Sequence, residues 1–135
     1  MPSIQTLSLS LAYLAATPLV HALGINCRGS FYCTFGKADA FSADNLRWFI
    51  NSVDDAKSFA NGDHIACVEG GICAFLQNTN GLKGAELKKL APYIVEHGCT
   101  VCGSVPTDYP KSNDVKKGEL TFNYVSKPKC DNGLC

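Results

Sequence analysis

The sequence lacks a net charge, because its 135 residues include 12 Lys and Arg against 12 Asp and Glu. A chain without a strong overall field has little long-range attraction for nucleic acid or for an anionic membrane surface. We therefore expect no nucleic-acid partner. The length is that of a single domain, with no internal repeat and no low-complexity tract.

Signatures of catalysis are also absent from the sequence. There is no G-x-S-x-G nucleophile elbow, no H-E-x-x-H zinc motif, no phosphate-binding glycine loop and no dinucleotide fingerprint. Asp63 precedes His64, but neighbouring residues of a strand point to opposite faces, which is poor geometry for a catalytic dyad. We expect no enzymatic activity, no cofactor and no bound metal.

The first 22 residues contain no Lys, Arg, Asp or Glu. Their apolar run ends in Val20-His21-Ala22, with small residues at the two positions that signal peptidase reads. We interpret residues 1–22 as a secretory signal peptide and residues 23–135 as the mature extracellular domain. A membrane anchor is the alternative, but it needs about 20 apolar residues, and Pro18 with scattered Ser and Thr shortens this run.

All eight cysteines follow that leader, at Cys27, Cys33, Cys67, Cys73, Cys99, Cys102, Cys130 and Cys135. An even count in a small secreted domain predicts four disulfides. The Cys99-Thr-Val-Cys102 motif alone is also typical of a redox pair or half of a zinc site. We favour disulfides, because no second CxxC occurs and His64 and His97 fit no metal-ligand spacing. Spacing alone leaves the pairing open.

Apolar periodicity predicts two helices. The first runs from about Ala43 to Phe59, ends before Asn61-Gly62, and places on one face Leu46, Phe49, Ile50 and Val53. Trp48 lies off that face, and we favour packing of its ring against a loop over a role in binding. The second helix runs from about Gly84 to His97, with Pro92 predicted to kink it or divide it.

Strand patterns fill the remaining segments. Ile65–Val68 and Ile72–Gln77 flank a short glycine turn and predict a hairpin, and Leu120–Val125 alternates between apolar and polar residues. Thr100–Val105 is a fourth candidate, and the segment that begins at Leu23 is a fifth. This order predicts an α+β fold, in which an antiparallel sheet of about five strands carries both helices on one face.

Three segments, LGINCRGSFYC, CTVCGSVP and LTFNYV, occur in this order, with His97-Gly98 ahead of the second. Together they resemble the fungal killer-toxin family typified by the virally encoded killer protein 4 of a smut fungus. The resemblance spans Leu23 to Cys130. It implies an α/β sandwich with two antiparallel helices on one side of the sheet. It also implies a secreted, non-enzymatic antifungal protein that blocks calcium uptake through voltage-gated calcium channels of the target cell.

The resemblance further implies a disulfide pairing. By position in the family, Cys27 would join Cys99, Cys33 would join Cys102, and Cys67 would join Cys130. Elimination then leaves Cys73 with Cys135.

The family prototype carries a basic cluster just before the cysteine that corresponds to Cys67, but here these positions read Gly62-Asp63-His64-Ile65-Ala66. The remaining cations are candidates for contact with a target: Arg28, Lys111, Lys116, Lys117, Lys127 and Lys129. They would form one positive patch, or the lysines of Pro110–Gly118 would belong to an ordinary solvated loop, which we favour.

A second class of function stays open beside the toxin. A secreted effector or binding module for cell-wall carbohydrate or a host protein would expose a row of aromatic side chains, because sugars stack on rings. The aromatics in question are Phe31, Tyr32, Phe35, Trp48 and Tyr109. In either case we expect a monomer.

Overall fold

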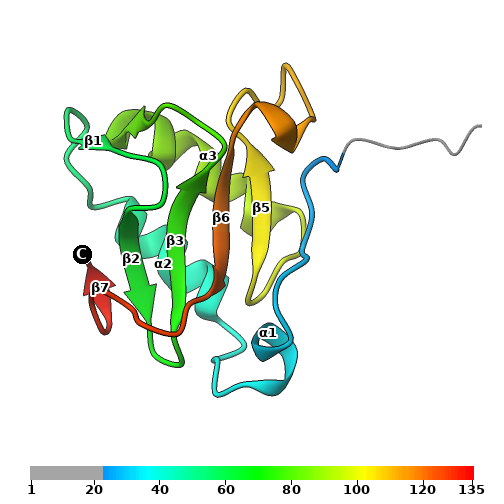
Figure 1. Ribbon diagram of the computed structural model, residues 1–135, viewed down its shortest axis with the longest axis vertical. Helices are drawn as coiled ribbons and strands as arrows, with labels where there is room; N and C mark the ends of the chain where they lie inside the picture. Colours follow the sequence, from blue (N-terminus) through cyan, green and yellow to red (C-terminus); the bar gives the residue numbers. More distant parts are fainter. Residues whose placement is uncertain (1–22) are drawn as a thin grey trace, which may run out of the picture.

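A computed structural model describes residues 23–135 of the chain, and the predicted signal peptide lies outside the described residues. Five strands form an antiparallel sheet in the order β5-β6-β3-β2-β7 (Figure 1). In chain order the five are β2 (His64–Val68), β3 (Ile72–Gln77), β5 (Gly103–Pro106), β6 (Glu119–Tyr124) and β7 (Gly133–Leu134). Two further short strands, β1 (Ser58–Phe59) and β4 (Leu82–Lys83), pair only with each other.

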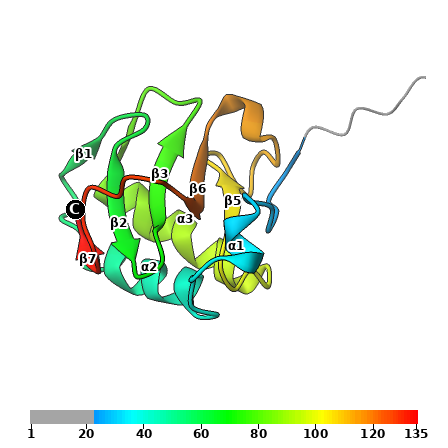
Figure 2. The same ribbon diagram turned by 60° about the horizontal axis from the view of Figure 1, so that its bottom comes forward.

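Both longer helices, α2 (Ser42–Ile50) and α3 (Gly84–Glu96), lie on the same face of the sheet (Figure 2). The core forms between this face and the helices, where Leu46 and Ile50 of α2 and Leu87 and Ile94 of α3 are fully buried. Phe122 of β6, a strand with neighbours on both sides, is the largest fully buried side chain of the described residues. The α+β prediction, with two helices on one face of an antiparallel sheet, is confirmed.

The first helix is much shorter than predicted. It ends at Ile50, and Val53 and Phe59 are buried although neither is helical. The Asp54 carboxylate accepts a hydrogen bond from the Ala56 backbone N–H at 2.9 Å, a turn that competes with helical hydrogen bonding. The chain then forms β1 where a helical continuation was predicted.

The second helix matches its predicted limits, from Gly84 to Glu96 with His97 as the C-cap. Gly98 follows with a φ of 98°, a left-handed conformation that suits glycine at a helix end. The predicted division at Pro92 does not occur, and α3 continues through it as one helix. Leu90 and Ile94, buried on either side of the proline, hold both halves against the sheet.

The hairpin of β2 and β3 and the strands β5 and β6 lie where they were predicted, but the fifth strand does not. The N-terminal segment makes only one isolated bridge, between Asn26 and Ser104. The Asn26 side chain then accepts the Arg28 N–H at 3.0 Å, which turns the chain away from the sheet edge. The fifth strand is β7, which pairs with β2 at the opposite edge.

Four disulfides include all eight cysteines. The bonds Cys27–Cys99 and Cys33–Cys102 agree with the pairing that the family resemblance implied. The other two predicted bonds, Cys67–Cys130 and Cys73–Cys135, are wrong. The structure instead contains Cys67–Cys73 and Cys130–Cys135.

The register of the sheet explains the local pairing. Cys67 of β2 lies directly opposite Cys73 of β3, with their Cα atoms 4.0 Å apart. Cys130 and Cys135 are separated by only five positions and lie at the two ends of the turn that leads through β7. All four sulfurs still lie close together, because the Cys67 Sγ is 3.7 Å from the Cys135 Sγ.

Candidate functional site

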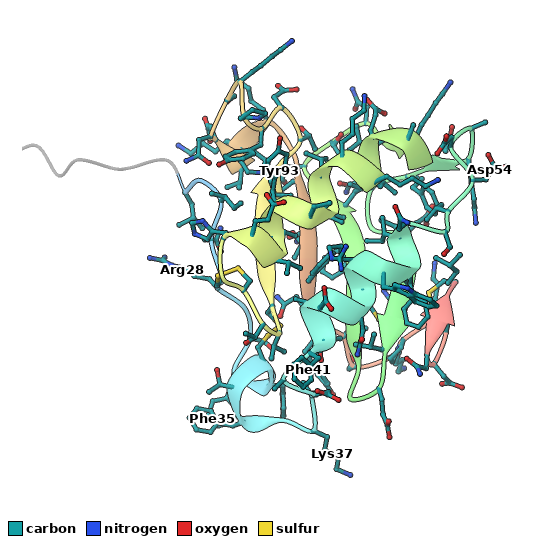
Figure 3. The ribbon with its side chains drawn as sticks, turned by 180° about the vertical axis from the view of Figure 1, so that it is seen from behind. Arg28, Phe35, Lys37, Phe41, Asp54 and Tyr93 are labelled. Carbon is teal, nitrogen blue, oxygen red and sulfur yellow. A yellow bond between two sulfur atoms is a disulfide. The ribbon has the colours of Figure 1, made fainter. Side chains whose placement is uncertain are left out.

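The candidate cations do not form one patch. Lys116 and Lys117 lie in a 3-10 turn, η1 (Val115–Lys117), immediately before β6, and Lys111 lies in the same loop. Lys127 and Lys129 follow the other end of β6. A strand of six residues separates its ends by about 17–20 Å, and Arg28 lies beside the Cys27–Cys99 and Cys33–Cys102 disulfides, at the β5 edge (Figure 3).

The loop before β6 carries three exposed lysines and is held in shape by its own backbone. The Asp114 carboxylate accepts the Lys116 N–H at 2.9 Å and thereby caps η1. Lys117 reaches the rim of a polar groove of about 500 Å³, which is also lined by Asn61, Asn78, Thr79, Asn80, Leu82 and Glu86. Within residues 23–135, Lys111, Lys116 and Lys117 make no ion pair.

The position of the family's basic cluster contains a different arrangement. Ile65 and Ala66 are buried in β2, so the polar side chains left at the surface there are those of Asp63 and His64. The Asp63 carboxylate lies 3.9 Å from the Lys129 ammonium, and the His64 Nδ1 accepts the Lys129 backbone N–H at 3.1 Å.

The environment of His64 favours its neutral form. Burial and the neighbouring Lys129 charge lower the pKa of His64 below its usual value, and Asp63 opposes them with a smaller effect. Because Nδ1 already accepts the Lys129 N–H, it is not free to act as a base. The arrangement therefore offers a structural contact between β2 and the C-terminal segment in place of a catalytic dyad.

The groupings of His and Cys that could resemble a metal site in the described residues consist of His64, Cys67 and Cys73, and of Cys67, Cys130 and Cys135. Their cysteines are all disulfide-bonded, and a metal requires the thiolate. Cys99 and Cys102 of the CxxC motif each bond to a different cysteine of the N-terminal segment, so they form neither a redox pair nor half of a zinc site.

The exposed aromatic side chains gather around the short helix α1 (Tyr32–Phe35). Phe31 is 68% exposed, Tyr32 51% and Phe35 70%, and Phe41, which the sequence pattern did not single out, is 68% exposed. Tyr109 is not part of this group, because its ring packs edge-on against Tyr93 at 4.8 Å. Phe41 lies directly before α2, and an apolar residue at such a position is easily assigned to the buried face.

Trp48 is 63% exposed, so the prediction that its ring packs against a loop is wrong. Leu46 and Ile50 lie on the buried face of α2, and the indole ring lies in an edge arrangement with the neighbouring Phe49 ring at a centroid distance of 5.3 Å.

Two pairs of rings stack around α1. Phe31 stacks on Phe35 with a centroid distance of 4.6 Å and an interplanar angle of 26°. Tyr32 lies against Tyr124 of β6 at 4.5 Å. No residue of α1 is buried, and the helix is instead fixed by the Cys33–Cys102 disulfide and by the Ser30 N–H, which donates to the Asn123 Oδ1 at 3.0 Å.

Within residues 23–135 the structure contains no helix that is long and apolar enough to span a membrane. The Kp4 family model matches residues 10–126 of the chain. The KP4 killer toxin of the Ustilago maydis P4 virus is 39% identical over 119 residues, an alignment that covers 83% of this chain and 87% of that protein. The family model covers most of the chain and the identity extends over most of both proteins, so this chain belongs to the Kp4 killer toxin family.

Proposed function

We propose that this protein is a secreted killer toxin that inhibits the growth of competing fungi or plant cells by blocking calcium uptake through voltage-gated calcium channels. The observation that carries the proposal is the 39% identity to a killer toxin over most of both chains. Disulfides hold the surface of the described residues in a fixed shape. The neighbouring Asp63 and His64 are already engaged in a structural contact, because His64 accepts the Lys129 N–H. Binding, without catalysis, is the activity that such a surface supports.

The surface that contacts the channel is, in this proposal, the loop that carries Lys111, Lys116 and Lys117. Cations can block a pore whose mouth carries rings of acidic side chains, and an ammonium group without a carboxylate partner acts at full strength. Lys129 is partly neutralised by Asp63 at 3.9 Å. The loop lysines have no such partner within residues 23–135.

The two lysine pairs provide a charge-matched test. Lys116→Glu with Lys117→Glu and Lys127→Glu with Lys129→Glu change the net charge equally at opposite ends of β6. The purified oxidised proteins are applied to fungal cells and plant roots while growth and calcium influx are followed, with and without added calcium. We expect the wild type and the Lys127/Lys129 variant to reduce growth and influx, added calcium to restore growth, and the Lys116/Lys117 variant to be inactive.

Each part of the proposal has its own refutation. If growth falls while calcium influx is unchanged and added calcium gives no rescue, the channel mechanism is wrong. If the Lys127/Lys129 variant loses activity and the Lys116/Lys117 variant keeps it, the contact surface is wrong although the mechanism stands. If the wild-type protein affects neither growth nor influx, the toxin function is refuted for the cells tested.

The sequence-based alternative, a carbohydrate-binding effector, receives less support. It would require several open ring faces in a row, whereas Phe31 and Phe35 cover one face of each other and Tyr109 packs on Tyr93. The aromatic group is better explained by a different ligand.

A further inference from the structure

We define the aromatic knob as Phe31, Tyr32 and Phe35 of the α1 region together with Phe41. Among residues 23–135, these four account for most of the large apolar side chains that are exposed. It lies at one end of the molecule, beyond the end of β6 (Figures 1 and 3). Soluble proteins seldom expose large apolar patches without a partner. We therefore take this end of the molecule as a candidate binding surface.

The shape of the knob discriminates between ligands. Sugars stack on open ring faces, but Phe31 and Phe35 lie face to face at 4.6 Å, and Tyr32 covers Tyr124 at 4.5 Å. What remains exposed is a convex group of ring edges and outer faces. Aromatic rings of this kind are enriched where proteins meet the boundary between lipid headgroups and acyl chains.

The charges around the knob fit the same ligand. Lys37 is exposed next to the labelled rings Phe35 and Phe41, and Arg28 is exposed farther from them, along the β5 edge (Figure 3). The acidic residues near these rings include Asp39, whose carboxylate accepts the Phe41 N–H at 2.8 Å, Asp44 of the first turn of α2, which pairs with Arg47, and Glu69 of the β2–β3 turn. The local net charge is thus small, so the rings must supply most of the affinity and the two cations a smaller part.

The knob is also held ready for binding. The Cys33–Cys102 disulfide and the bond from Ser30 to Asn123 fix α1 to the sheet, so little conformational entropy remains to be lost on association. We propose that the aromatic knob inserts into the outer surface of a phospholipid bilayer, with Arg28 and Lys37 on the phosphates. This interaction does not depend on the channel, and it concentrates the protein on the membrane in which a channel would lie.

The test uses the oxidised mature chain and vesicles of phosphatidylcholine, with and without phosphatidylserine. The knob variant is Phe31→Ser with Phe35→Ser, and Trp48→Ser on α2 is the matched control, because it removes a ring that is exposed to a similar degree. We expect the knob variant to lower the vesicle partition coefficient at least about tenfold, given the apolar area removed, and the control to leave it within about twofold. Arg28→Gln with Lys37→Gln should lower binding to the vesicles that contain phosphatidylserine by at most about fivefold in total, a smaller loss than that of the knob variant, because nearby carboxylates offset the two cations.

A fluorescence experiment measures insertion directly. Trp48 is the only tryptophan of the chain, so Phe35→Trp in a Trp48→Phe background places a single reporter in the knob. Its emission should shift to the blue with vesicles, while that of the wild type should not. The proposal is overturned if the wild type fails to bind vesicles, if Trp48→Ser weakens binding as much as the knob variant, or if the knob variant instead loses binding to insoluble β-glucan or chitin. Because no target cell is involved, failure here is distinct from failure of the channel assay.

Discussion

The disulfides Cys27–Cys99 and Cys33–Cys102 should be energetically coupled, because both join the same two segments of the chain. Their sequence separations are 72 and 69 residues, and closing one loop of this length in the unfolded chain is worth about 4.4 kcal/mol in the chain-entropy model. Once either bond exists, the other closes a ring of only about ten residues, worth about 2.7 kcal/mol. Replacing either cysteine pair with alanine should therefore cost about 2.7 kcal/mol, and replacing both pairs about 7 kcal/mol.

The assay is urea unfolding followed by circular dichroism, after peptide mapping has shown that the remaining cysteines pair as in the structure. Cys99 and Cys102 are both 3% exposed, so alanine leaves a similar small void at each. The free-energy costs of these two voids add, and they leave the coupling energy between the disulfides unchanged. The control is Cys67→Ala with Cys73→Ala, which removes a bond that spans six positions. Its cost in unfolding free energy should simply add to the cost of removing either Cys27–Cys99 or Cys33–Cys102. If removing both Cys27–Cys99 and Cys33–Cys102 costs the sum of the two single removals, to within about 0.5 kcal/mol, the shared-loop reasoning is refuted.

Two further predictions concern the helix packing and the histidine. Gly84→Ala should destabilise the protein although alanine favours helices, because a Cβ at this position would overlap the Asp54 carbonyl oxygen and approach Val53; a raised urea midpoint would contradict this. The lowered pKa of His64 means that the unfolded chain binds a proton more readily than the folded one, so stability should fall as the pH drops through about 6.5. His64→Gln should flatten that decline between about pH 7 and 5.5, and an unchanged slope would assign it to other groups.

Sequence periodicity predicted the elements whose burial and secondary structure coincide. In α3 the buried residues recur with the period of the helix, so pattern and structure agree. After Ile50 the apolar pattern and the secondary structure no longer agree. Val53 lies in a turn and Phe59 in a short strand, and both are buried. An apolar pattern reports which residues are buried and not which backbone conformation buries them, and the Asp54 turn was the local signal that limited the helix.

The candidate site was less predictable, because it depends on where strands end. Lys117 and Lys127 are close in sequence but lie at opposite ends of β6, so the spacing of the lysines hid their separation. The pairing of Cys67 with Cys73 depended on the register of β2 and β3. The hairpin turn sets this register, but the family resemblance implied that Cys67 would instead join Cys130.

The structure of α1 gives a physical role to the segment LGINCRGSFYC. A helix of four residues is not stable alone, and no residue of this one is fully buried, so hydrophobic packing contributes little to its stability. Two disulfides to the CxxC segment hold α1 in place, as burial in the core holds α2 and α3. Their effect is to hold Phe31 and Phe35 outside the core, in a fixed conformation and in contact with solvent. If these disulfides served only the stability of the domain, a polar residue at either position would serve as well, which is why the exposed rings call for a ligand.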